Sequence, residues 1–169
     1  MIFVLRLVHI IFGVFWVGSV LFVTFLLMPS LRAVGPSAGA VMNQLSQARK
    51  MPMIMMLSAA LTIVAGIWLM MIDSAGAPGG WMKSGTGRTY GIGAALAILT
   101  LVLGMAINAP TARRMGAIAA AAAKRAGPPS ADEARELARL QARMATGSII
   151  VSVLLLLATA AMAVARYVP

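Results

Sequence analysis

The chain of 169 residues has no cysteine, a single histidine and only four acidic residues. The lack of cysteine excludes a disulfide framework, a thiolate metal site and a thiol nucleophile. One histidine leaves no base for a nucleophilic serine, and so few carboxylates leave no pair for acid–base catalysis or an intramembrane proton relay. P-loop, Rossmann and metalloprotease motifs are also missing. Catalysis by side chains alone is therefore not expected, and an enzymatic role would require a bound redox group.

Apolar residues, in contrast, make up 61% of the chain, and the mean hydropathy is +0.93. Long apolar stretches cover residues 2–28, 52–72, 89–109 and 147–166, and none of them contains an acidic residue. Each supplies the roughly 20 residues that a hydrocarbon core about 30 Å thick requires. The sequence predicts an all-α fold, a bundle of four transmembrane helices forming one integral membrane domain over residues 1–169. The first and third stretches share no clear repeat.

The net charge of +10 is unevenly distributed. Ten of the fourteen Lys and Arg residues fall in the first and third connections between the apolar stretches. The positive-inside tendency places these connections in the cytoplasm and both termini outside, as in a bacterial-type inner (plasma) membrane. Basic residues beside apolar spans are attracted to anionic headgroups, so we expect anionic lipid and no nucleic acid as the partner.

The third connection, residues 111–146, predicts a helical hairpin that extends the third and fourth helices into the cytoplasm. Apolar residues recur at helical spacing in both halves. They are Met115, Ile118 and Ala122 in the first half and Leu137, Leu140 and Met144 in the second. Gly127 and two prolines make the turn, and Ser130 followed by Glu133 fits a capping box. Arg135, Arg139 and Arg143 form a basic ridge, which we interpret as a surface near anionic lipid. The alternative is a surface that docks an acidic partner.

Among the residues of the apolar stretches, His9 is the strongest candidate for a functional site. It shares one helical face with Arg6, Gly13 and Trp16. An ionisable side chain at membrane depth is costly, and neutral imidazole is a common ligand of haem iron and copper. Arg6 nearby suits an anionic group such as a propionate. The alternative is a structural histidine, hydrogen-bonded to a backbone carbonyl or hydroxyl of a neighbouring helix.

Depth along the helices limits which residues can share a site with His9. Counting about 1.5 Å per residue from the helix ends places His9 level with residues 66–70, 94–97 and 158–162. Met70 and Met162 are therefore its nearest thioether partners, and thioethers suit Cu(I). Because one histidine cannot supply bis-His ligation, haem would need His/Met ligation, a five-coordinate iron or a symmetric dimer that pairs two His9 residues.

These residues resemble a known family. His9, Trp16 with Val17 and Gly18, and Pro29 with Arg32 resemble the first helix of the copper-resistance protein D (CopD) superfamily. The haem-binding HemJ-type protoporphyrinogen oxidases share a similar first-helix pattern. The third span is also similar, since residues 86–91 (Thr-Gly-Arg-Thr-Tyr-Gly) lead into an apolar helix that reaches Gly104 and Asn108. The resemblance implies a four-helix membrane protein with haem or copper at His9.

The third helix departs from this pattern. A lysine typical of these relatives would fall near Gly93, where the chain has no basic side chain. If that lysine is needed, the scaffold has been kept and the activity lost. Arg88 matches the family position, although an interfacial arginine reaching headgroups is the simpler interpretation.

Two functions follow from the sequence. The first is a membrane protein that binds haem b or copper, with His9 and Met70 as metal ligands. The full set of candidate cofactor-binding residues is Arg6, His9, Trp16, Met70, Arg88 and Met162. The second is a cofactor-free accessory or scaffold subunit of a larger membrane complex, or a homodimer, which uses small-residue faces for helix contacts.

Overall fold

The computed structural model describes residues 1–35, 38–75 and 78–169. The first rod consists of α1 (Ile2–Phe22), the π-helix η1 (Val23–Leu27) and α2 (Met28–Val34). The first connection holds α3 (Ala38–Asn43) and the π-helix η3 (Gln44–Ala48), and the second rod is α4 (Met51–Asp73). After α5 (Pro78–Trp81), the third rod is formed by α6 (Gly85–Leu103), the π-helix η4 (Gly104–Asn108) and α7 (Ala109–Lys124). The fourth rod is α8 (Ala131–Val164), followed by the 3₁₀ turn η5 (Ala165–Tyr167). No strand occurs in the described ranges, and the predicted all-α four-helix bundle is confirmed.

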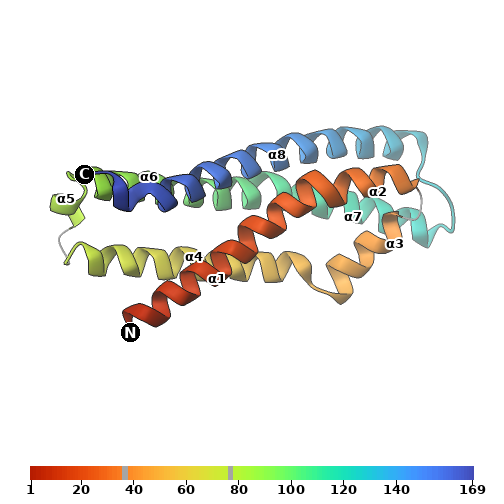
Figure 1. The fold of residues 1–169 in the computed structure, drawn as a ribbon. Coiled ribbons are helices and arrows are strands. Elements are labelled where there is room, and N and C mark those ends of the chain that lie inside the picture. The colour runs from red at the N-terminus through yellow and green to blue at the C-terminus, as the bar shows by residue number, and fades with distance from the viewer. Residues whose placement is uncertain (36–37, 76–77) are drawn as a thin grey trace.

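Figure 1 shows the four rods running lengthwise together, with both chain termini at one end, here called the terminal end. At the opposite end, the hairpin end, α7 and α8 are joined by the connection that links the third and fourth rods. The first rod runs obliquely: α1 packs mainly on α4, whereas η1 contacts α8. The third and fourth rods pack closely along α6 and α8. The bundle therefore has two main seams, α1–α4 and α6–α8.

Charged residues mark two levels along the bundle. A charged residue brackets the apolar part of each rod at either end, and no Asp, Glu, Lys or Arg lies between the two. The pairs are Arg6 and Arg32, Asp73 and Lys50, Arg88 and Arg113, and Arg166 and Arg143. They are 23 to 26 residues apart in sequence, which is about 35–39 Å at helical rise and close to the thickness of a bilayer with its interfaces.

Apolar side chains between these levels face outward. Val14 is 68% exposed, Ile92 58% and Leu157 52%, a distribution that water would penalise and that lipid acyl chains accommodate. All four rods are long and apolar enough to cross a membrane. The chain is thus a multi-pass integral membrane protein.

The helices α6 and α8 approach each other closely because the residues between them are small. A Cβ added at Gly93 would lie 3.3 Å from the Ala158 carbonyl oxygen and 3.1 Å from Cε of Met162. Such close backbone approach takes the place of hydrophobic drive between helices in lipid. A small core of buried residues then joins the first, second and fourth rods: Trp16, Val20, Ala59, Val151 and Leu155.

Proline lies inside two of the rods without ending them. Pro29 and Pro110 each follow a π-turn by two residues, after η1 and η4 respectively. A proline ring clashes with the carbonyl four residues earlier, and a wider turn relieves that clash. Both prolines open the same pattern, Pro-Ser-Leu-Arg and Pro-Thr-Ala-Arg, which ends at Arg32 and Arg113. The first and third rods therefore share a local repeat that the sequence analysis does not identify.

The hairpin forms as the sequence predicts. Ile118, Ala122 and Leu140 are buried between α7 and α8. The capping box is present, because the Ser130 side chain accepts the Glu133 N–H and the Glu133 carboxylate accepts the Ser130 N–H. Arg125 donates to the same carboxylate at 2.5 Å and so links the end of α7 to the start of α8.

These contacts predict that the hairpin loses stability in acid. The Ser130 N–H, followed by the Arg125 guanidinium, lowers the pKa of Glu133 below its ordinary value of 4.5. A carboxylate with a lowered folded pKa contributes stability that is present above the unfolded pKa and lost as the pH falls through the folded pKa. We therefore expect Glu133→Gln to flatten the fall in melting temperature below about pH 4.5. Thermal unfolding followed by circular dichroism between pH 7 and pH 3 measures this.

Glu136→Gln is the matched control for this titration. Within the described residues the Glu136 carboxylate has no ion-pair partner. The control should keep the wild-type pH dependence. Equal flattening in both variants would show that general charge, and not the cap, causes the acid sensitivity.

Candidate functional site

His9 lies in the α1–α4 seam and is tied to the backbone of the neighbouring helix. Its Nδ1 is 2.8 Å from the Thr62 carbonyl oxygen, and the ring is partly buried. A carbonyl only accepts, so Nδ1 carries the proton and donates it. In the neutral ring the lone pair then lies on Nε2, which makes Nε2 the atom able to bind a metal or accept a further hydrogen bond.

Two glycines allow this close contact. A Cβ added at Gly66 would lie 2.7 Å from Cε1 and 2.9 Å from Nδ1 of His9, so only glycine leaves room for the imidazole. At Gly13 the nearest atom would be Cγ2 of Thr62, at 3.4 Å. The Thr62 hydroxyl donates to the Ser58 carbonyl at 2.8 Å, so it is satisfied within α4 and does not compete for His9.

The predicted face of α1 is the face that packs on α4. From the terminal end inward, Arg6 pairs with Asp73, His9 contacts Gly66 and Thr62, and Gly13 lies against Thr62. Trp16, one turn deeper, is 6% exposed and belongs to the core with Ala59. Because α1 and α4 are antiparallel, successive residues on this face of α1 contact residues that lie progressively earlier in α4.

Arg6 has an acidic partner that the sequence analysis does not assign to it. Its guanidinium lies 3.7 Å from the Asp73 carboxylate, and the two side chains are 59% and 37% exposed. An ion pair this open contributes little stability. It does place a carboxylate at the rim of the seam, where an incoming propionate or phosphate would compete with Asp73 for Arg6.

The other candidate residues lie in different places. Met70 is one helical turn beyond Gly66 on α4 and is partly buried. Met162 packs against Gly93 in the α6–α8 seam. Arg88 is exposed in the first turn of α6. The structure brings Arg6, His9 and Trp16 to one seam and puts Met162 in the other.

The described residues contain no group of three or more His, Cys, Asp or Glu side chains suited to a metal ion. A metal at His9 would therefore have one imidazole from this chain and its other ligands from a thioether, solvent or a second copy. The imidazole itself fits that role, because ligating histidines almost always donate their other ring N–H to a carbonyl or carboxylate.

Thr62 and Asp73 are site residues that the sequence does not reveal, and Gly66 is placed at the right depth without being recognised as a contact of His9. The depth count does put Gly66 level with His9, and the contact between them confirms that level. A depth count would also have paired Arg6, near the start of α1, with Asp73, at the end of α4, because both lie at the terminal end of the bundle. The Thr62 carbonyl is a backbone group and leaves no signal in the sequence.

Fold and site together define a class, the all-α multi-pass membrane proteins with a histidine held in a helix seam. Comparison with known proteins adds no further assignment. No protein-family model, no curated protein and no solved structure matches the chain.

Proposed function

We propose that this membrane protein binds a redox-active metal group, haem or copper, through Nε2 of His9. The proposal rests on the hydrogen bond from Nδ1 to the Thr62 carbonyl, which leaves Nε2 as the ring nitrogen with a lone pair. A structural histidine would make the same bond, so the cofactor content of His9→Ala distinguishes the two roles. The bond selects the tautomer and orients the ring, as the outer partners of metal-binding histidines do. The resemblance of the first helix to the CopD and HemJ-type proteins supports the same assignment.

Neighbouring residues would serve this group in distinct ways. Gly66 provides the clearance in which the imidazole sits, and Trp16 closes the seam below it. Met70, one turn from Gly66, is the candidate second ligand for copper, since a soft thioether favours Cu(I). When bound, haem or copper would supply one-electron chemistry that no side chain of this chain provides.

We expect His9→Ala to remove the bound group. For haem, the purified wild-type protein would show a Soret absorption that the variant lacks. For copper, elemental analysis would find the metal in the wild type and little in His9→Ala or Met70→Leu. Absorption spectra and metal content per chain, measured on protein purified from membranes, decide between the two.

Met162→Leu is the control, because Met162 lies in the other seam and should leave cofactor content unchanged. Two results contradict the proposal. One is a wild-type protein that purifies colourless and free of metal. The other is equal cofactor content in wild type and His9→Ala.

The second candidate function is a cofactor-free accessory subunit that packs against other membrane helices. Gly18 and Gly104 favour it, because a Cβ added at either would meet nothing within 4 Å. Small residues at an open helix surface let another backbone approach closely in lipid. In that case the protein would purify colourless, elute together with partner subunits or as a homodimer, and keep these assemblies in His9→Ala.

The proposed orientation follows from charge. The first and third connections lie at the hairpin end and hold ten of the fourteen basic residues. By the positive-inside tendency, this charge supports a cytoplasmic hairpin end in a bacterial-type plasma membrane. Arg135, Arg139 and Arg143 are exposed there, so the hairpin would also attract anionic lipid in general.

A further inference from the structure

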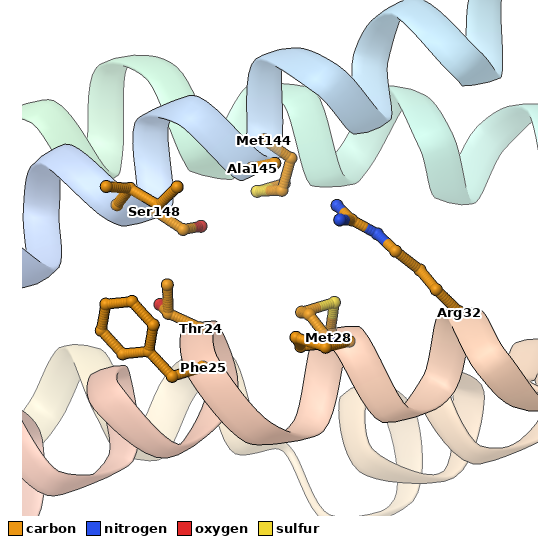
Figure 2. A pocket seen from close by; sticks show the side chains of 9 residues that line it. Thr24, Phe25, Met28, Arg32, Met144, Ala145 and Ser148 are labelled. Atoms are coloured by element: carbon orange, nitrogen blue, oxygen red, sulfur yellow. The ribbon is translucent and has the colours of Figure 1, made fainter.

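A groove separates the first and fourth rods near the hairpin end, far from His9. Its volume is about 230 Å³, and its walls come from η1 and α2 on one side and α8 on the other. Figure 2 shows Met28 and Met144 in the middle of the groove, Thr24 and Ser148 toward one end, and Arg32 extending from α2 at the other. The groove therefore has an apolar middle and a cationic end.

The depth of the groove matches the structure of a phospholipid. Arg32 is at the charged level of the hairpin end, where headgroups lie. Thr24 is eight residues earlier, or about 12 Å deeper into the bilayer at helical rise. The cation is thus at phosphate depth, and the methionine-lined part lies at the depth of the acyl chains.

Arg32 has no acidic partner in the part of the chain that the structure describes. Three of the four acidic residues pair with other arginines, since Asp73, Asp132 and Glu133 contact Arg6, Arg135 and Arg125. The remaining acid, Glu136, forms no ion pair among the described residues. An arginine presents a planar donor fork that binds phosphate through two hydrogen bonds, and Arg32 is available for it.

Size and local structure select the kind of ligand. A volume of 230 Å³ is below the roughly 300–1,000 Å³ of pockets that enclose whole small molecules. A groove of this size fits one part of a larger molecule whose remainder lies in the bilayer. The π-turn η1 forms one wall of the groove. On the opposite wall, the small side chains of Ala145 and Ser148 leave the groove open. Thr24 is held in place by the fully buried Ser152, whose hydroxyl is 3.1 Å from its own.

We propose that this groove is a specific site for an anionic glycerophospholipid. The phosphate binds Arg32, and one acyl chain lies between Met28 and Met144. The site is distinct from general attraction of lipid to the basic hairpin and does not depend on any cofactor at His9.

Native mass spectrometry of the full chain, titrated with phosphatidylglycerol, tests the proposal. Arg32→Gln should weaken binding of the first lipid about tenfold, the loss expected for a charge-assisted contact to phosphate. Ala145→Phe fills the groove without changing charge and should weaken it to a similar extent. Phosphatidylcholine of the same chain length should bind more weakly to the wild type, and glycerol 3-phosphate should not displace the lipid.

Arg113→Gln is the matched control, because Arg113 ends the equivalent Pro-Thr-Ala-Arg pattern and lines neither described cavity. It should change the affinity by less than about twofold. Circular dichroism melting of each variant establishes that it is folded. Equal losses in Arg32→Gln and Arg113→Gln would overturn the proposal in favour of non-specific attraction. Displacement by glycerol 3-phosphate would overturn it in favour of a soluble phosphate ligand.

Discussion

Replacing Gly147 by alanine is expected to lower the free energy of unfolding by about 2 kcal/mol, within the usual cost of overpacking a tight contact. The added Cβ would lie 2.4 Å from Oδ1 of Asn108 and 3.5 Å from Cγ2 of Ile107. Asn108 ends the π-turn η4, and its Oδ1 is buried without a hydrogen-bond partner among the described residues. The added methyl group must displace this amide oxygen, and the displacement costs free energy. Titration with SDS of the protein in bicelles, followed by circular dichroism, measures the loss.

A second substitution, at Asn108, tests whether the contact with its side chain causes the loss of stability in Gly147→Ala. In an Asn108→Ala background the clashing oxygen is gone, so Gly147→Ala should cost little there. Gly104→Ala is the control, because a Cβ at that position meets nothing within 4 Å, and alanine favours the helix by up to about 1 kcal/mol. A loss that persists in the Asn108→Ala background would refute the steric explanation.

The four-helix fold is predictable from the sequence because apolar length alone sets the number of spans. The ends of the rods are less predictable. The apolar stretch at residues 2–28 stops before Pro29, yet the helix continues to Val34. The third rod likewise continues through Pro110 into α7. In lipid, a π-turn satisfies the backbone around a proline better than an open chain end would, so proline here does not end a helix.

The sequence predicts the depth of the candidate site along the helices but not which neighbouring helix each side chain faces. Counting residues gives the depth of His9 and its helical face, and both agree with its contact to Gly66. The count does not give the rotation of each helix about its own axis. Met70 and Met162 therefore look equivalent in the sequence, although Met162 faces Gly93 in the other seam. The groove at Arg32 is missed for the same reason, since it depends on how η1 faces α8.

Gly66→Ala is expected to cost about 2–3 kcal/mol of unfolding free energy, the sum of overpacking and a lost interhelical hydrogen bond. The new Cβ would occupy the space of the His9 ring, at 2.7 Å from Cε1 and 2.9 Å from Nδ1. The imidazole must leave the Thr62 carbonyl, and Nε2 then loses its fixed direction. The same variant should therefore also reduce any haem or copper bound at His9. SDS titration gives the stability, and metal content per chain gives the occupancy.

A double-mutant cycle with His9 separates the contact from the general effect of a larger side chain. If the ring is what the methyl displaces, Gly66→Ala should cost less than about 1 kcal/mol in the His9→Ala background, a coupling typical of residues in direct contact. Gly18→Ala, on the same helix as His9 but with nothing within 4 Å of the new Cβ, should leave stability and cofactor content near wild type. Additive losses at positions 9 and 66 would mean that the α1–α4 seam does not depend on the imidazole, and the case for a built histidine site would fall with it.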